Sequence, residues 1–318
     1  MFTSVVLAGA AGSIGSPLLR KLLESSSPTF QVTVLTRKGH STTDTSSKQT
    51  PSSVVENPRQ KTVAVDYNDH ASLVQALSGA DVVVSALPNP VIQTVDHLLL
   101  RAAQEAGVRR IFPSEYTLDV LHPAAVAAFG EESPVVQSAR KFVSLAESDS
   151  VTSFTTIVTG MFTDLALGGG LLNIWNWTDL QVTSIDGGDK VFTTSSTEFV
   201  AASIVAALKM DEEKTKNRRI RIAENQTTIR GMTSVLEEVA GCKFQAIELS
   251  SQELSKRKEE ADKTGDKLAM YVNPLLRVNF DGSGAGNFQE GLEFGAEGEW
   301  YVPRKSLKEL AQEVMKSR

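Results

Sequence analysis

A glycine-rich turn near the start of the chain is the strongest chemical signal in the sequence. Gly9, Gly12 and Gly15 are spaced three residues apart, directly after an apolar run, and Ser13 and Ile14 lie between the last two. Glycines in this arrangement let the backbone turn tightly and approach a pyrophosphate, whose charge then lies at the N-terminus of the next helix. The alternative is a tight turn that binds nothing. The strand–turn–helix context favours a dinucleotide site.

The end of the second strand pattern carries cations where a dinucleotide enzyme selects its cofactor. An acidic residue there accepts a hydrogen bond from the ribose 2′-hydroxyl of NAD, whereas a cation suits the 2′-phosphate of NADP. The chain reads Thr36, Arg37, Lys38 without a nearby carboxylate. Arg37 can bind a phosphate through two parallel hydrogen bonds, so NADPH is the expected cofactor. The alternative is a solvated basic strand end.

Asp66 follows the third strand pattern and has two readings. Its carboxylate could hydrogen-bond adenine, or it could cap the helix that begins near Ala71. The sequence leaves both open.

The first half of the chain alternates strand and helix patterns. Repeated βα units predict a Rossmann-type α/β fold, in which a doubly wound parallel sheet carries helices on both faces. A polar segment over residues 38–61 is expected to be a surface loop. The expected strands are 4–8, 31–35, 62–65, 81–86, 110–112 and 153–159, and the expected helices are 14–24, 71–78, 91–106 and 134–148.

The alternation stops after Gly160. Residues 180–185 and 190–194 look like strands, and residues 186–189 between them predict a hairpin-type connection. We therefore expect an NADP-binding Rossmann domain over residues 1–160. Residues 161–318 are expected to form a smaller α/β substrate-binding region, interleaved with the end of the sheet.

Composition restricts the classes of protein and partner. The 318 residues carry 32 Lys and Arg against 38 Asp and Glu, a net charge of −6, so we expect no nucleic-acid partner. Cys242 is the single cysteine, and the four histidines match no short metal motif, so no metal site is expected. No leader pattern and no run of 18 apolar residues occurs, which predicts a cytoplasmic protein without a membrane span. The sequence is compatible with a homodimer but does not determine the oligomeric state.

Two further segments point to a family. Residues 103–116 read AQEAGVRRIFPSEY and residues 154–162 read FTTIVTGMF. Together with the glycine turn and Arg37, they resemble the NmrA-like/isoflavone reductase-like family of atypical short-chain dehydrogenase/reductases. The resemblance is dense over residues 1–167, returns over 192–208 and is faint over 250–318. It implies an NADPH-bound Rossmann domain, with the substrate held over the nicotinamide in a C-terminal cleft.

The resemblance also implies a catalytic lysine on the helix after the Pro-Ser-Glu element. Reductases of this family lack the Tyr-x-x-x-Lys dyad, and Tyr116 here has no lysine four residues later. The chain offers Arg140 and Lys141. The family spacing fits Arg140 better, but an arginine keeps its proton near neutral pH. Lys141 lies nearly opposite the apolar face of the helix, so it is either the catalytic group or a surface cation.

The remaining candidate positions follow from the expected fold, from the aromatic residues and from the resemblance. The cofactor is expected to contact Ala86, Leu87 and Pro88 after the fourth strand, Ser114 of the Pro-Ser-Glu element, and Thr159, Gly160 and Phe162 after the sixth strand. Tyr116, Met161, Trp175 and Trp177 are expected to line the substrate pocket, although tryptophans are as often part of a core.

The expected function is an NADPH-dependent reductase of a small apolar metabolite, aromatic or polyketide-like, of the kind found in secondary metabolism. Hydride would pass from the nicotinamide to this substrate. Two alternatives stay open. One is a redox-sensing regulator that binds NADP without catalysis, and the other is a non-redox enzyme on the same fold.

Overall fold

The computed structural model describes residues 1–39, 57–88, 91–288, 292–294 and 301–317, and the segment 38–61 predicted as a loop lies largely outside them. The chain forms two compact units. The first contains Met1–Glu115, Lys141–Thr156 and Ile204–Arg219, and the second contains Tyr116–Arg140, Ile157–Ser203 and Ile220–Arg318. The chain therefore passes between the units several times.

The main sheet confirms the predicted Rossmann-type fold. Among the described residues it has eight strands in the order β14-β11-β6-β5-β4-β1-β2-β3, and the pairs from β3 to β6 are parallel. The order reverses at β1, as in a doubly wound sheet. The strands are β1 (Ser4–Ala8), β2 (Gln31–Arg37), β3 (Gln60–Val65), β4 (Val82–Ser85), β5 (Arg110–Phe112), β6 (Ser153–Val158), β11 (Arg218–Ile222) and β14 (Leu292–Phe294).

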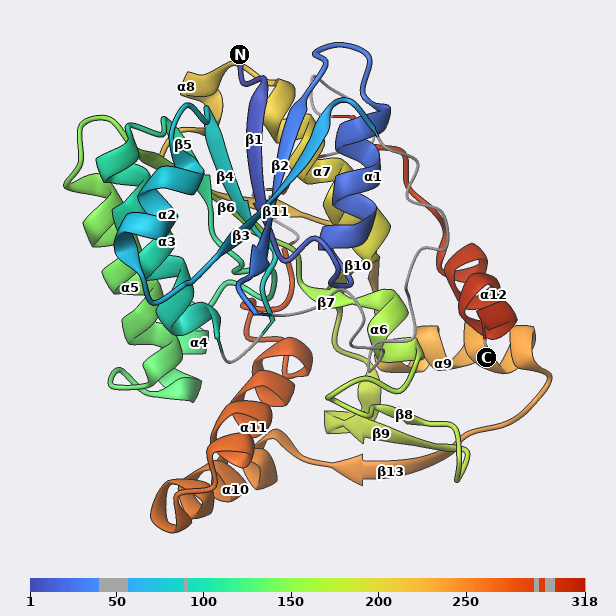
Figure 1. The fold of residues 1–318 in the computed structure, drawn as a ribbon. Helices are drawn as coiled ribbons and strands as arrows, with labels where there is room; N and C mark the ends of the chain where they lie inside the picture. Colours follow the sequence, from blue (N-terminus) through green and yellow to red (C-terminus); the bar gives the residue numbers. More distant parts are fainter. Residues whose placement is uncertain (40–56, 89–90, 289–291, 295–300, 318) are drawn as a thin grey trace. The chain divides into compact units, whose positions relative to one another are not determined.

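Helices cover both faces of this sheet in the first unit. Figure 1 shows α1 on one side of β1 and β2, with α2, α3 and α5 on the other. Asp69 caps α2 by accepting a hydrogen bond from the Ser72 amide, and Gly107 ends α3 in the left-handed conformation. The bounds are α1 (Gly15–Glu24), α2 (His70–Leu77), α3 (Ile92–Ala106), α5 (Pro134–Glu147) and α8 (Glu212–Thr215).

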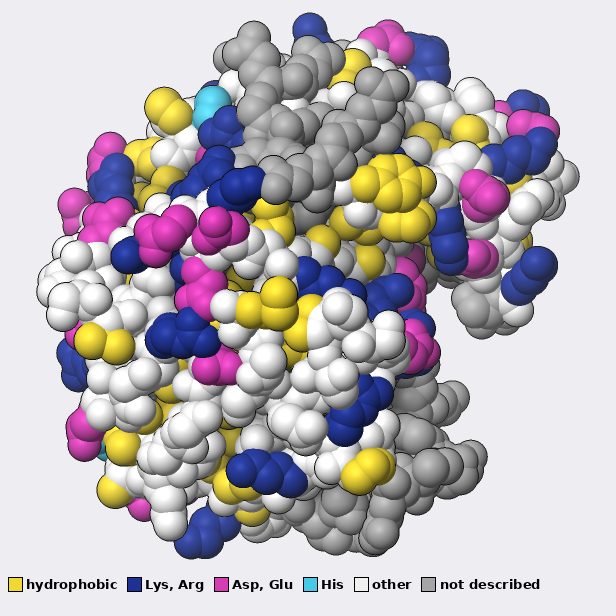
Figure 2. Space-filling view, turned by 90° about the horizontal axis from the view of Figure 1, so that it is seen from above, with side chains coloured by type: hydrophobic (Ala, Val, Ile, Leu, Met, Phe, Trp, Pro, Cys, Tyr) yellow, Lys and Arg dark blue, Asp and Glu magenta, His cyan; other side chains and the backbone are white. Residues whose placement is uncertain are grey.

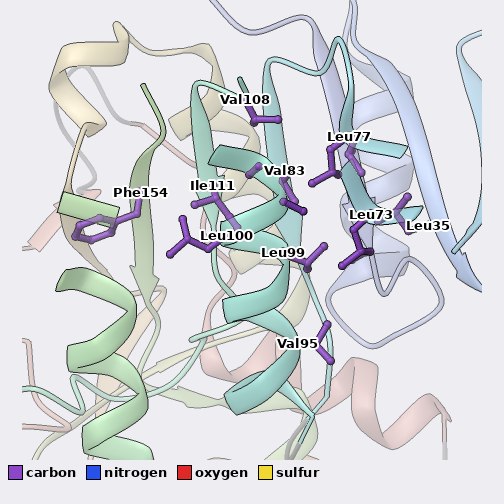
Figure 3. Packing of buried hydrophobic residues seen from close by; sticks show 14 of the residues in the cluster. Leu35, Leu73, Leu77, Val83, Val95, Leu99, Leu100, Val108, Ile111 and Phe154 are labelled. Atoms are coloured by element: carbon purple, nitrogen blue, oxygen red, sulfur yellow. The ribbon is translucent and has the colours of Figure 1, made fainter. Parts of the chain in front are cut away.

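A core of aliphatic side chains joins α2, α3 and α5 to the sheet. β4 is buried over its whole length, as expected for a parallel strand with helices on both faces. Figure 3 shows Leu99 of α3 on the side of Leu73 of α2, and Leu100 beside Ile111 of β5. This core holds the carboxyl ends of the central strands at one edge of the sheet.

The second unit contains two small sheets. Their orders are β12-β10-β7 and β13-β9-β8. The predicted hairpin over residues 186–189 is wrong, because β9 and β10 belong to different sheets and Asp186–Gly188 forms a 3-10 turn between them. The strands are β7 (Met161–Phe162), β8 (Trp175–Asn176), β9 (Gln181–Ile185), β10 (Phe192–Ser195), β12 (Asn225–Thr227) and β13 (Gln245–Leu249).

The sequence patterns predicted no helix at the positions of α4, α6 and α11 of the second unit. Among these three, α11 contains Pro274 and packs against both α4 and α10. Apolar packing of α11 here outweighs the cost of an internal proline. The bounds are α4 (Pro123–Phe129), α6 (Thr163–Leu167), α7 (Thr197–Lys209, shared with the first unit), α9 (Ile229–Ala240), α10 (Ser251–Thr264), α11 (Lys267–Phe280) and α12 (Leu307–Ser317).

Surface charges are mixed in sign. On the face shown in Figure 2, Lys and Arg side chains lie among Asp and Glu side chains instead of forming one basic area. None of the helices in the described part of the chain is long and apolar enough to cross a membrane.

Candidate functional site

The glycine turn lies at the carboxyl end of β1 and packs directly on the end of β4. Gly9 has φ +84°, and a Cβ atom there would lie 2.7 Å from the carbonyl carbon of Ala86 and closer still to its oxygen. A Cβ at Gly15 would lie 2.8 Å from the carbonyl carbon of Gly9. The Gly12 amide donates to the Gly9 carbonyl at 3.0 Å. Gly9 and Gly15 are therefore required by close backbone packing as well as by the turn.

The N-terminus of α1 carries no competing anion. Its N-cap residue, Ile14, makes no side-chain hydrogen bond, and the first turn of the helix has no acidic residue. Side chains cap the N-termini of α2, α4, α8, α9, α10 and α11. The N-terminus of α1 is thus suited to a phosphate, since its backbone N–H groups and helix dipole attract negative charge. Gly12 and Ser13 in front of it are exposed.

Arg37 and Lys38 are exposed at the end of β2. The Lys38 amide donates to the Val65 carbonyl at 2.8 Å, which holds this strand end against β3. Tyr67 follows β3 close to Arg37. Burial raises the pKa of Tyr67 to about 12, while the positive charge of Arg37 acts in the opposite direction. Both cations lie at the same edge of the sheet as the glycine turn, because β1 and β2 are parallel neighbours.

One of the two readings of Asp66 is excluded. The cap of α2 is Asp69, whose carboxylate accepts from the Ser72 amide at 3.3 Å. Asp66 is exposed, and its carboxylate accepts from the Asn68 amide at 2.9 Å. The adenine contact stays a prediction.

The ends of β4 and β5 are tied together. The Ser114 hydroxyl donates to the Leu87 carbonyl at 2.8 Å, so the Pro-Ser-Glu element contacts the segment that follows β4. Ala86 is buried, Leu87 is half-buried and Pro88 is exposed. Five predicted cofactor segments, those at Gly9, Arg37, Asp66, Ala86 and Ser114, therefore follow five neighbouring strands of one sheet. Ligands of open α/β sheets bind at this carboxyl edge.

Two acidic residues of this edge were not identified as site residues from the sequence. Asp96 is buried in α3 and accepts hydrogen bonds from the Ser85 hydroxyl at 2.6 Å and the Ser114 amide at 2.7 Å. Glu115 binds Arg219 through two hydrogen bonds of 2.8 and 3.1 Å, which explains the glutamate of the Pro-Ser-Glu element. The available signal was Asp96 itself, a carboxylate on the helix face that carries Leu99, Leu100 and Ala103.

Asp96 should make folding stability depend on pH. Burial raises its pKa from 3.8 to about 7, the negative charge of Glu115 adds to the increase, and the hydrogen bonds from Ser85 and Ser114 oppose it. The unfolded chain releases this proton near pH 4 and the folded chain only near pH 7, so stability is lost as the pH rises between these values.

The expected result is measured by urea unfolding of wild type and Asp96→Asn at pH 5, 6, 7 and 8. The free energy of unfolding of wild type, relative to the variant, should fall by about 1.4 kcal/mol per pH unit below pH 7 and level off above it. If the free energies of unfolding of wild type and Asp96→Asn differed by the same amount at all four pH values, the pKa of Asp96 would not be raised by folding.

In the second unit, the segment after β6 is fixed by tight backbone packing. The Thr159 amide donates to the Thr117 carbonyl at 2.9 Å. Gly160 has φ +68°, and a Cβ atom there would lie 2.9 Å from the carbonyl carbon of Thr193. Met161 is buried beside Thr194, whose hydroxyl donates to the Met161 carbonyl at 2.9 Å. Phe162 is half-buried, and Tyr116 is buried near the start of the unit.

The prediction that Trp175 lines a substrate pocket is corrected. Its side chain is 0% exposed, and its indole N–H donates to the Thr233 hydroxyl at 2.9 Å. Trp177 donates to the Leu167 carbonyl at 2.7 Å and packs edge-on against Phe244. Trp175 belongs to the core of the second unit and Trp177 packs against it. Of the two roles considered for Trp175, the structure supports the one in the hydrophobic core.

Arg140 and Lys141 differ in their surroundings. The apolar face predicted for this helix is buried or half-buried, and both cations are exposed. Arg140 forms an ion pair with Glu131. Lys141 is the member of the pair that could give up a proton.

Residues 2–264 match the model of the NmrA-like family. The chain belongs to the NmrA-like family. This confirms the resemblance seen in the sequence.

Among individual relatives, the chain is 26% identical to an isoflavone reductase of Glycine max over 291 residues, covering 86% of this chain and 87% of the relative. It is 24% identical to the phenylcoumaran benzylic ether reductase POP1 of Populus trichocarpa over 318 residues, covering 95% of each. It is also 26% identical over 222 residues to an oxidoreductase of Aspergillus flavus, covering 70% of this chain and 69% of that one. These relatives are reductases and oxidoreductases.

Solved structures share the fold at low sequence identity. A crystal structure of isoflavone reductase has a TM-score of 0.73 at 18% identity and covers all of both chains. The structure described as AtPrR2 with NADP+ and (+)pinoresinol has a TM-score of 0.70 at 19% identity, with 99% of each chain covered. A leucoanthocyanidin reductase–NADPH complex from Vitis vinifera has a TM-score of 0.69 at 18% identity, covering 98% of this chain and 99% of that chain.

Proposed function

We propose that this NmrA-like protein is an NADPH-dependent reductase that transfers hydride to a small apolar metabolite, aromatic or polyketide-like. The proposal rests on the residues at the carboxyl edge of the sheet in the first unit. A helix N-terminus without a side-chain cap follows a glycine turn, and two exposed cations end the neighbouring strand. Family membership and the NADPH-bound structural relatives support it.

The residues of this edge fit the cofactor. The N-terminus of α1 would bind the pyrophosphate, and Arg37 with Lys38 would bind the 2′-phosphate. Asp66, which follows β3, would contact adenine, and Ala86, Leu87, Pro88 and Ser114 would contact the part of the cofactor nearer the nicotinamide. When bound, NADPH supplies the hydride from C4 of its nicotinamide.

The substrate side of the proposal rests on family resemblance. Thr159, Gly160 and Phe162 are proposed to contact the nicotinamide, and Tyr116 and Met161 the substrate. Trp177 is half-buried and is still proposed to contact the substrate, whereas Trp175 is fully buried and is no longer proposed to do so. Relatives named for pinoresinol, phenylcoumaran and isoflavone substrates support an aromatic acceptor.

Lys141 is the proposed proton donor, because Arg140 is paired with Glu131 and keeps its proton. Lys141→Ala should lower turnover about tenfold while NADPH affinity stays unchanged. This is less than the usual contribution of a general acid, about 10²–10⁴, because Lys141 is exposed. Lys216→Ala, an exposed lysine of the same unit, is the control. Equal turnover in wild type and Lys141→Ala would remove Lys141 from the mechanism.

The function is tested by adding NADPH to the purified protein and following its fluorescence, then measuring NADPH oxidation with aromatic and polyketide-like acceptors. Binding together with turnover of one acceptor class supports the proposal. Absence of binding contradicts it.

A second candidate, an NADP-binding regulator without catalysis, is favoured by the exposure of Lys141 and the ion pair of Arg140. NADPH binding without turnover of any acceptor, together with co-purification of a partner protein, would support this candidate over the reductase. A non-redox reaction on the same fold would instead consume substrate without oxidising NADPH.

A further inference from the structure

Asp96 connects the ends of two neighbouring strands from beneath the proposed cofactor site. It lies in α3 with its side chain 5% exposed. One carboxylate oxygen accepts from the hydroxyl of Ser85, the last residue of β4, and the other accepts from the amide of Ser114, two residues after β5. A single side chain therefore fixes the point at which β4 ends and the point at which β5 ends.

The connection continues to the residues proposed to contact the cofactor. The Ser114 hydroxyl donates to the Leu87 carbonyl at 2.8 Å, so the segment after β4 is held at Ser85 and again at Leu87. Ala86 lies between these two points, and its carbonyl group is the one against which Gly9 packs. Three cofactor-binding segments thus take their relative positions from contacts that include the Asp96 carboxylate.

Burial makes the charged form of a carboxylate energetically unfavourable, so a carboxylate is not the simplest side chain with which to hold two strands together. Burial raises the pKa of Asp96 to about 7, and Glu115 beside Ser114 makes the charge less favourable still. Tyr67, which follows β3, also lies close enough to be influenced by this charge. An apolar residue would avoid the cost, but it would leave the buried amide of Ser114 without this acceptor. The arrangement is therefore explained by the position it gives to the strand ends.

We propose that Asp96 is a positioning residue of the dinucleotide site, which sets the spacing between the ends of β4 and β5 that the cofactor contacts. This inference rests on the proposed NADPH-binding function and adds a residue to it. Asp96 is not proposed to touch the cofactor.

The test compares three variants by NADPH fluorescence titration, with circular dichroism to show that each is folded. Asp96→Ala removes both hydrogen bonds and should weaken NADPH binding about tenfold or more. Asp96→Asn should bind within about threefold of wild type, because the amide can accept from the Ser114 N–H and donate to the Ser85 hydroxyl. Asp69→Ala is the matched control, since Asp69 also accepts from a backbone amide but only caps α2. It should bind NADPH like wild type.

Two results would overturn the proposal. One is an Asp96→Ala protein that binds NADPH as tightly as Asp69→Ala. The other is an Asp96→Asn protein that binds as weakly as Asp96→Ala, which would mean that the bridging hydrogen bonds are not what matters. If Asp96→Ala does not fold, Ser85→Ala replaces it. That variant removes one of the two hydrogen bonds and should weaken binding about threefold, and unchanged binding would contradict the proposal.

Failure of the proposed function looks different. In that case wild type itself does not bind NADPH, and all variants are alike.

Discussion

Replacing Gly9 with alanine is expected to lower NADPH affinity at least a hundredfold, a loss of about 2.7 kcal/mol of binding free energy. The new Cβ would lie 2.7 Å from the carbonyl carbon of Ala86, which is backbone and cannot rotate away. Either the glycine turn or the end of β4 must shift, and both are proposed to contact the cofactor. The positive φ of +84° adds strain of about 1–2 kcal/mol for a residue with a side chain.

Gly79→Ala separates the two effects. Gly79 has φ +78°, but a Cβ atom there would meet nothing within 4 Å. This variant should lose about 1–2 kcal/mol of folding stability and bind NADPH normally. Fluorescence titration measures binding and urea unfolding measures stability. Equal loss of NADPH affinity in both variants would show that global destabilisation, and not the contact with Ala86, causes the effect.

Replacing Arg37 with alanine is expected to weaken NADPH binding about ten- to a hundredfold while NADH binding barely changes. A charge-assisted hydrogen bond to a partly exposed phosphate contributes roughly 1.5–3 kcal/mol, and only NADPH carries the 2′-phosphate. Arg37→Asp should move the preference further towards NADH, because the carboxylate repels the phosphate and can accept from the ribose hydroxyl.

Arg20→Ala is the control for Arg37. Arg20 is an exposed arginine of α1 that pairs with Glu24, so its removal changes the net charge equally. NADPH affinity should change less than twofold. If Arg20→Ala weakens NADPH as much as Arg37→Ala, the effect comes from overall charge and not from a contact with the phosphate.

The sequence was informative where structure is local. The turn from β1 to α1 needs glycine at positions that a single pattern can reveal, and the strand–helix alternation follows from short-range periodicity. The end of β2 is also local, since Arg37 comes two residues after the buried stretch 32–35 of the same strand. These features predicted the fold of the first unit and its candidate cofactor residues.

The parts that were missed depend on contacts between distant segments. Nothing near residues 186–189 indicates that β9 pairs with β13 and β10 with β12. From the sequence, Pro274 disfavours a helix at α11, because the cost of an internal proline is compensated by packing against α10 and α4, which the sequence does not reveal. Likewise, Trp175 could be assigned to a core only once Thr233 was seen to accept its N–H. The role of Asp96 became apparent only from the hydrogen bonds that it accepts from Ser85 and Ser114, which lie 11 and 18 residues away.

The carboxyl edge of the first unit is proposed to bind NADPH through its 2′-phosphate. The most direct measurement is a pair of fluorescence titrations of the wild-type protein, one with NADPH and one with NADH. We predict that NADPH binds at least about tenfold more tightly, as one charge-assisted contact to the phosphate requires. NADH binding as tight as NADPH binding, or no change in the fluorescence of NADPH, would contradict the account.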